Sequence, residues 1–391
     1  MPQVPRTLDP TLSACDRFGA VLRHWRQLRQ LSQAQLATVL PVTPDQIAKY
    51  EKAVRWPSQK AVERIDEHLE AGGELITLWT EGEAEREIAR NSKAPVDGAY
   101  VDHWTQMLSA LAAAGNAVGG RRFLDIVTTE IAVISRFGAA ATGQVAAGFL
   151  STQARWLEFG SWIADNQGDR LNATVMLKRA GGLAERARDT VFGAYVLMRR
   201  AQRAYEEDQP RVCLDLVESV ASTNQPPRIR ALLATRAAQA HAALGDGPAM
   251  RRSLKRAFLD ACRDSTPDKI DLELASHSTP SYVLAHEGIC LLTLGEPNGA
   301  VGVLETVLQD WPASHRLDEG LVRAHLAFAQ ATTGALDEGV DQARRALALG
   351  LETGSERTLR ILRRVMNERL DGAAGHRELV IQWAAAAQGG S

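Results

Sequence analysis

The chain has 391 residues, of which 45% are hydrophobic and 24% are Asp, Glu, Lys or Arg, a composition typical of soluble globular proteins. Its formal net charge of −2 excludes a uniformly basic protein that binds nucleic acid indiscriminately. No apolar run approaches the ~18 residues of a membrane span, and two or three folding units are expected from the length.

The cysteines are scattered along the chain and form no CxxC pair. They are Cys15, Cys213, Cys262 and Cys290. This spacing predicts reduced thiols rather than disulfides or a zinc site. The opening residues MPQVPRTLDP lack the basic and apolar segments of a secretion signal. We therefore expect residues 1–16 to form a flexible tail and the protein to be cytoplasmic.

Charge is distributed unevenly near the N-terminus. Residues 1–62 hold nine Lys and Arg against four Asp and Glu, whereas residues 63–91 hold nine acidic residues against three basic ones. A small basic unit on an otherwise acidic chain is typical of a DNA-binding module. Chance clustering of cations on a solvated face is the alternative.

Residues 17–72 contain the signals of four short helices. Apolar residues at three- and four-residue steps predict a helix over 17–30. Ser32 and Thr43 are suitable N-caps for a second and a third helix, and Ser58 for a fourth. Four short helices, with a tight turn between the second and the third, form the helix-turn-helix arrangement.

The run LRQLSQAQLATVLPVTPDQIAKYEKAVRWPS at 28–58 resembles the phage-repressor-like, or XRE, family of helix-turn-helix regulators. The positions that follow the family pattern are Leu31, Ser32, Gln33, Leu36, Ala37, Ile47 and Glu51. The sequence departs from that pattern at two turns, where Pro41 and Ala53 stand in place of the usual glycines.

The resemblance implies roles for individual residues at a DNA interface. Gln33 would bind a phosphate at the start of the second helix. The third helix would enter the major groove with Thr43, Pro44, Asp45, Gln46 and Lys49 on its leading end and outward face. Gln46 would pair with adenine and Lys49 with guanine. Asp45 would either accept from cytosine or stabilise the N-terminus of the helix.

Lys52 and Arg55 follow the third helix and are expected on phosphates, with free surface cations as the alternative. The resemblance also implies an ion pair between Arg26 and Glu51 that supports the domain rather than reading DNA. Because one such domain offers few base contacts, we expect a homodimer on paired half-sites of a double-stranded DNA operator.

Residues 73–100 predict a closing helix followed by a linker. Leu75, Leu78 and Trp79 give the first half an apolar side that would pack on the DNA-binding domain. The second half becomes acidic and polar and ends at Ser92-Lys93-Ala94-Pro95, which predicts a connector.

Residues 101–391 show no alternation typical of strands, so the whole chain is predicted to be all-α. Short breaks separate Ala- and Leu-rich segments at 166–169, 206–210, 244–248, 294–298 and 332–336. The resulting pairs of helices resemble tetratricopeptide (TPR) repeats, best over 229–262. Such repeats stack into an α-solenoid with a concave binding face. An irregular helical bundle is the alternative.

The whole layout resembles actinobacterial XRE regulators with C-terminal TPR-like repeats, including the stretch GGRRFLDIV at 119–127. It is more loosely similar to the RRNPP group of peptide-pheromone regulators, in which signal binding in the solenoid reorients paired DNA-binding domains. The resemblance implies that residues 101–391 dimerise and sense a peptide, a small molecule or a protein partner.

Polar residues on the first helix of each pair are the candidates for lining the concave groove. They are Arg155, Asn166, Arg199, Arg203, Arg236, Gln239, Tyr282, His286 and Arg323. For each of them, a surface or inter-helix role is the competing interpretation. A groove rich in arginine would favour an acidic peptide or a carboxylate ligand.

Enzymatic motifs are not apparent, so we expect neither catalysis nor a cofactor. His286-Glu287 begins like the HExxH zinc motif, but Cys290 stands where the second histidine is required. The main alternative to a DNA-binding regulator is therefore a TPR-type interaction module in which DNA binding is secondary or lost.

Overall fold

The computed structural model describes residues 14–40, 42–91, 98–221, 224–263, 274–275 and 277–388, and every regular element within these ranges is a helix. The predicted all-α fold, a helix-turn-helix domain followed by a region of repeated helices, is confirmed. Contacts divide the chain into two units, Met1–Gly98 with Ala132–Phe149, and Ala99–Ile131 with Leu150–Ser391.

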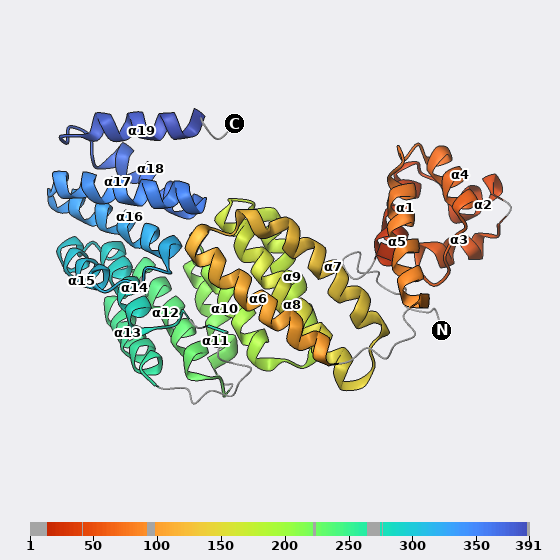
Figure 1. Ribbon diagram of the computed structural model, residues 1–391, viewed down its shortest axis with the longest axis horizontal. Coiled ribbons are helices and arrows are strands. Elements are labelled where there is room, and N and C mark those ends of the chain that lie inside the picture. Colours follow the sequence, from red (N-terminus) through yellow and green to blue (C-terminus); the bar gives the residue numbers. More distant parts are fainter. Residues whose placement is uncertain are drawn as a thin grey trace. The chain divides into compact units, whose positions relative to one another are not determined.

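Five helices form the N-terminal part of the first unit (Figure 1). They are α1 (Ala14–Leu28), α2 (Gln33–Val39), α3 (Pro44–Glu51), α4 (Gln59–Leu69) and α5 (Glu74–Asn91). The starts of α2 and α3 lie where the sequence predicted them, because Ser32 and Thr43 each form a capping box with the residue three positions later. Phe18, Ile47 and Ile65 are fully buried in the core that these helices share.

Helix α5 closes this core and is longer than the sequence predicted. Its start is fixed by Asp66, whose carboxylate accepts hydrogen bonds from the backbone N–H groups of Gly73 (2.8 Å) and Leu75 (3.0 Å). We expected a connector in the second half, but the helix continues to Asn91 because Ala, Glu and Arg are good helix formers. The expected tail lies outside the described residues up to position 13, as do linker residues 92–97.

The remaining helices begin with α6 and α7, of which α7 contributes to both units. The first group comprises α6 (Ala99–Val118), the short 3-10 helix η1 (Arg121–Phe123), α7 (Leu124–Ala140), α8 (Gly143–Asn166), α9 (Arg170–Ala187), α10 (Thr190–Glu206) and α11 (Pro210–Ala221). The second group comprises α12 (Pro227–Ala243), α13 (Gly247–Ala261), α14 (Pro280–Thr293), α15 (Pro297–Gln309), α16 (Arg316–Thr333), α17 (Leu336–Thr353), α18 (Glu356–Glu368) and α19 (His376–Gln388).

Helical hairpins repeat through the second unit. The five predicted breaks are the turns of the pairs α8–α9, α10–α11, α12–α13, α14–α15 and α16–α17. Four of these turns hold a glycine with left-handed backbone angles, which glycine adopts without steric cost. They are Gly168, Gly245, Gly295 and Gly334, with φ of 80°, 76°, 79° and 88°. The first helices α10, α12, α14 and α16 contact one another in series.

Helix α6 shares a cavity with residues of α8, α10, α14 and α16. It contacts α16 and α17, and its Gly115 lies against the ring of Trp162. After α6 the chain approaches the end of α17 so closely that a Cβ at Gly119 would lie 2.0 Å from the carbonyl oxygen of Thr353. Helix α6 therefore lies beside helices on which the sequence predicted ligand-binding residues.

Candidate functional site

Helix α3 carries the residues predicted to read DNA, and they lie on its solvent side. Its opposite side anchors it, because Ile47, Tyr50 and Glu51 are buried. The predicted residues are exposed at Thr43, Pro44, Asp45, Lys49 and Arg55 and half-buried at Gln33, Gln46 and Lys52. The exposed face of α3 is thus available to a groove of DNA while its buried face fixes the helix to the core.

A buried ion-pair network fixes α3 to α1 and α2. The Glu51 carboxylate is 2% exposed and accepts from Arg26 Nε (2.5 Å) and Nη2 (3.0 Å). Gln33 Nε2 donates to the same carboxylate at 2.8 Å, and Arg23 Nη2 donates to the Glu51 carbonyl oxygen at 3.1 Å. The ion pair expected between Arg26 and Glu51 is confirmed. It is a structural pair, since Glu51 has no access to solvent.

Gln33, which the resemblance assigned to a phosphate, is the first residue of α2. Its side chain is held in place by the hydrogen bond to Glu51. An amide NH₂ group has two protons, so the second one remains to donate to an oxygen outside the network. The position is therefore fixed before any DNA arrives.

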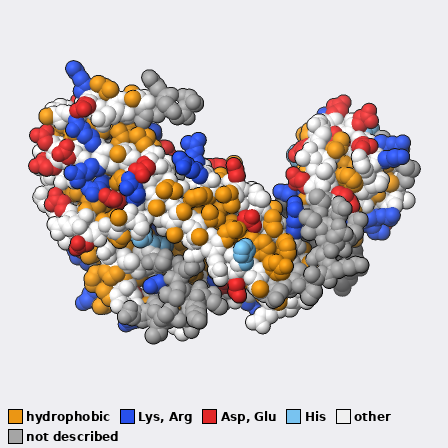
Figure 2. All heavy atoms as spheres, in the orientation of Figure 1, with side chains coloured by type: hydrophobic (Ala, Val, Ile, Leu, Met, Phe, Trp, Pro, Cys, Tyr) orange, Lys and Arg blue, Asp and Glu red, His pale blue; other side chains and the backbone are white. Residues whose placement is uncertain are grey.

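Charged groups surround the exposed face of α3. Asp45 and Lys49 form an ion pair at 2.6 Å in which both side chains are largely exposed. Such a pair contributes only ~0–1 kcal/mol, so it holds Lys49 weakly. Within the described residues, Lys52 and Arg55 have no ion pair. Figure 2 shows Lys and Arg side chains gathered on the edge of this unit where α2 and α3 lie.

The two departures from the family pattern have different outcomes. Ala53 follows α3 with a left-handed φ of 52°, which costs an L-residue roughly 1–2 kcal/mol compared with the right-handed region. The chain thus makes the turn that glycine usually makes, without glycine. Pro41 lies outside the described residues.

A partly open cavity of about 210 Å³ lies in the second unit, lined by residues of α6, α8, α10, α14, α16 and α18 and by residues just before α14. Four of the predicted ligand-binding residues line it: Arg155, Arg199, Tyr282 and His286. All nine predicted residues lie on the first helices α8, α10, α12, α14 and α16, but the structure brings only these four together at the cavity.

The other five predicted residues are placed elsewhere. Arg203 lines a separate groove, and Asn166 is 4% exposed. Arg236 is 1% exposed and donates to Gln239 Oε1 and to the Tyr282 hydroxyl. Arg323 is held by Glu319 and Gln342, each at 2.8 Å.

The arginines that face the cavity are already paired with carboxylates of the same chain. Arg199 Nε donates to Glu158 (2.9 Å), and Arg155 Nη1 donates to Asp189 (2.7 Å). Burial raises the pKa of Glu158, although Arg199 opposes the shift. Burial also acts to raise the pKa of Asp189, but Arg155 and hydrogen bonds outweigh it and the pKa is lowered.

A third arginine, Arg357, repeats this arrangement, since it pairs with Glu206 at 2.9 Å. Two histidines beside it are kept neutral. Burial, with Arg236 and Arg199, lowers the pKa of His277 to about 3. Burial, with Arg236 and Arg357, lowers the pKa of His286 well below its usual value. The three arginines Arg155, Arg199 and Arg357 at the cavity are therefore paired with carboxylates, and its two histidine rings are neutral.

Several residues at the cavity were not predicted from the sequence: Glu158, Asp318, Arg357 and His277. Glu158 lies three residues after Arg155 on α8, so helical spacing from that candidate could have found it. Asp318 and Arg357 lie on α16 and α18 and carry no local signal. His277 precedes α14, outside any helical pattern.

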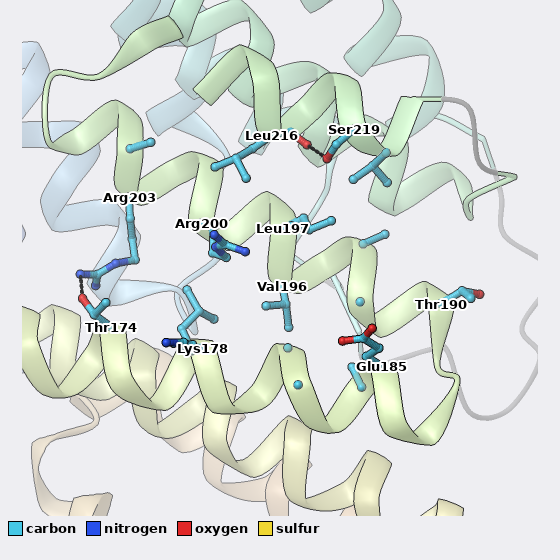
Figure 3. Close-up of a pocket in the computed structure, with 18 of the residues that line it drawn as sticks. Thr174, Lys178, Glu185, Thr190, Val196, Leu197, Arg200, Arg203, Leu216 and Ser219 are labelled. Atoms are coloured by element: carbon cyan, nitrogen blue, oxygen red, sulfur yellow. Dashed lines mark hydrogen bonds between the residues drawn. The ribbon is translucent and has the colours of Figure 1, made fainter. Parts of the chain in front are cut away.

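A second, open groove of about 1070 Å³ lies between α9 and α11, with α10 as its floor. Figure 3 shows Val196 and Leu197 on the floor and Leu216 on the α11 wall. Lys178 and Arg200 lie towards one end and Glu185 towards the other. The groove is mostly apolar and long enough to contact a peptide or a helix of a partner protein.

The family model of the helix-turn-helix domain matches residues 17–79. No curated protein and no solved structure matches the chain. None of the described helices is both long enough and apolar enough to cross a membrane. The matched range covers α1 to α4 and the first turns of α5, which include the capped α2–α3 pair and the exposed face of α3. Residues 17–79 are therefore a helix-turn-helix DNA-binding domain.

Proposed function

We propose that the protein is a sequence-specific transcriptional regulator of the XRE type that binds a double-stranded DNA operator as a homodimer. The observation that carries the proposal is the arrangement of α3. One face is locked to the core by Ile47 and the Glu51 network, while the opposite face presents Gln46 and Lys49 to solvent. A rigid helix with an exposed polar face is what base reading in the major groove requires.

The flanking residues support a division of roles on DNA. Gln33, at the first position of α2, and the cations Lys52 and Arg55 are suited to phosphates, which position the domain. Gln46 and Lys49 are suited to adenine and guanine edges, which specify the sequence. Asp45 either accepts from cytosine or, as its pairing with Lys49 favours, stabilises the start of α3.

We also propose that the helical repeats, which resemble TPR repeats of the actinobacterial XRE regulators, sense an effector and dimerise. Two features of the second unit support sensing. The smaller cavity of about 210 Å³ suits a small molecule, and the open groove of about 1070 Å³ suits a peptide or a protein partner. Dimerisation rests on the small number of base contacts that one domain offers.

The alternative is a TPR-type interaction module in which DNA binding is secondary or lost. Two observations favour it: Lys49 is engaged by Asp45, and Ala53 carries the strain that a glycine would relieve. In that case the groove between α9 and α11 would be the functional site, and α3 would not contact DNA.

A gel-shift assay separates the two functions. The full chain is titrated onto DNA from its own genomic neighbourhood at ~150 mM salt, because phosphate contacts weaken steeply with ionic strength. If the protein is a sequence-specific regulator, the labelled DNA should be shifted, and an equal concentration of unlabelled random DNA should not abolish the shift. An absence of any shift, or equal competition by random DNA, would contradict the regulator and leave the interaction module.

Catalysis forms no part of the proposed function, and neither does a cofactor or a metal. The His286-Glu287 stretch lies on α14, where His286 and Cys290 are both buried. Metal analysis of the purified protein tests this, and stoichiometric zinc would contradict it. We place the protein in the cytoplasm, where a regulator of transcription has access to DNA.

A further inference from the structure

The volume of the cavity limits the part of a ligand that it can hold. Its volume is about 210 Å³, and residues of α6 form one of its walls. A cavity of roughly 150 Å³ holds benzene. The volume therefore fits one aromatic ring with a short side chain.

Aromatic side chains form two parts of the wall. On α8, Phe159 and Trp162 stack with their ring centroids 5.6 Å apart. On α10, Phe192 and Tyr195 stack with centroids 6.0 Å apart. All four line the cavity. Such walls favour a flat apolar body, and their ring faces also attract a cation.

The three arginines that line the cavity are already paired with carboxylates of the chain. Arg155, Arg199 and Arg357 are each paired with a carboxylate of the chain at 2.7 to 2.9 Å. None of them is left to hold the carboxylate of a ligand. Asp318 also lines the cavity, and it has neither a hydrogen bond nor an ion pair within the described part of the chain. Burial raises the pKa of its carboxyl group, although the charge of Arg357 opposes the shift.

A second polar group is unpartnered at the same place. His286 is 7% exposed, and its Nδ1 has no hydrogen-bond partner among the described residues. A buried polar atom without a partner destabilises the folded protein, because it has lost its hydrogen bonds to water. A hydrogen-bonding group of a ligand would supply the missing partner. A ligand could therefore contact Asp318, His286 and the aromatic wall at the same time.

We propose that this cavity binds a small aromatic amine, with its ammonium at Asp318 and its ring among the four aromatic side chains. The inference rests on the proposed sensing role of the helical repeats and names the class of effector. It differs from the acidic ligand that the arginines suggested in the sequence, because those arginines are already neutralised by Glu158, Asp189 and Glu206.

Isothermal titration of the full chain with three probes of similar size tests the charge preference. The probes are 2-phenylethylamine, 2-phenylethanol and 3-phenylpropanoate. We expect the amine to bind at least tenfold more tightly than the other two, since a charge-assisted hydrogen bond is worth about 1.5–3 kcal/mol. Tighter or equal binding of the acid, or no saturable binding of the amine up to ~10 mM, overturns the proposal.

Two variants place the binding in this cavity. Asp318→Asn keeps the shape of the side chain and should lower the affinity for the amine about tenfold, so that amine and alcohol bind alike. Ala112→Phe, on the cavity side of α6, should fill the space and abolish binding while the circular dichroism of the helices is kept. Unchanged amine binding in either variant overturns the proposal.

Glu185→Gln is the matched control, because Glu185 is an exposed carboxylate in the groove between α9 and α11. It should leave the affinity for the amine unchanged. Because the titration contains no DNA, its result does not depend on whether the protein binds DNA. If the amine does not bind but the protein still shifts DNA in the gel, only the proposal of an amine effector is refuted. If the amine binds but no DNA is shifted, only the proposal of a DNA-binding regulator is refuted.

Discussion

Replacing Glu51 by Gln removes the charge at the centre of the DNA-binding domain and keeps the size of the side chain. Glu51 is 2% exposed and Arg26 is 11% exposed, so the variant leaves a guanidinium without a counter-ion and almost out of water. Removing one partner of a buried pair costs ~3–5 kcal/mol. Because Arg23, the other cation at this carboxylate, is 33% exposed, we expect the lower end, ~3 kcal/mol.

Hydrogen exchange of the full chain, measured by mass spectrometry, reports the loss of stability in the DNA-binding domain separately from the stability of the second unit. Amides of α1 to α3 should exchange about a hundredfold faster in Glu51→Gln, since 1.4 kcal/mol is a factor of ten. Glu70→Gln is the control, because Glu70 pairs with Arg29 but is 77% exposed. A change of less than tenfold in the Glu51 variant, or an equal change in the control, would refute the reasoning.

Three further changes test other parts of the molecule. Lys49→Ala should weaken operator binding and relax the preference at one base pair, by ~1–3 kcal/mol in a binding titration. Ala53→Gly should stabilise the domain by ~0.5–1 kcal/mol in thermal unfolding, because φ is 52° there. Burial, with Arg357 and Arg364, lowers the pKa of His325 to about 4, so stability should fall below about pH 6.5, and His325 alone should contribute at most ~1.4 kcal/mol per pH unit, in addition to His277 and His286.

Each of these has its own control. Equal losses on operator and on random DNA would show that Lys49 contacts only phosphate. Ala48→Gly, in the middle of α3, should cost about 1 kcal/mol, the opposite sign to the change at Ala53. His325→Gln removes the titrating group, so a variant whose stability falls with pH as steeply as the parent would contradict the role given to His325.

Much of the DNA-binding domain could be predicted because its signals are local. Ser32 and Thr43 act on backbone groups three residues away, and the apolar spacing of α1 needs only its own sequence. The ion pair of Arg26 and Glu51 joins residues far apart in the chain, and only the family resemblance revealed it. The extent of α5 was missed because a change to polar residues was interpreted as a linker, although those residues favour a helix.

The cavity could be predicted only in part, because it depends on packing over long sequence separations. The recurring breaks gave the helix pairs, and with them Arg155, Arg199, Tyr282 and His286. Nothing in the sequence indicated that α6 would line the cavity or that Asp318 would reach it. The acidic residues that neutralise the arginines lie on several helices, so their effect is visible only in three dimensions.

Selection of binding sites from random-sequence DNA by the full chain, at ~150 mM salt, tests the central claim most directly. Because a homodimer presents two copies of α3, the enriched sequence should contain two related half-sites centred ~10 bp apart or a multiple of that. Replacing Gln46 and Lys49 together by Ala should abolish the enrichment. No enriched sequence, or the same sequence enriched by that variant, would contradict the account.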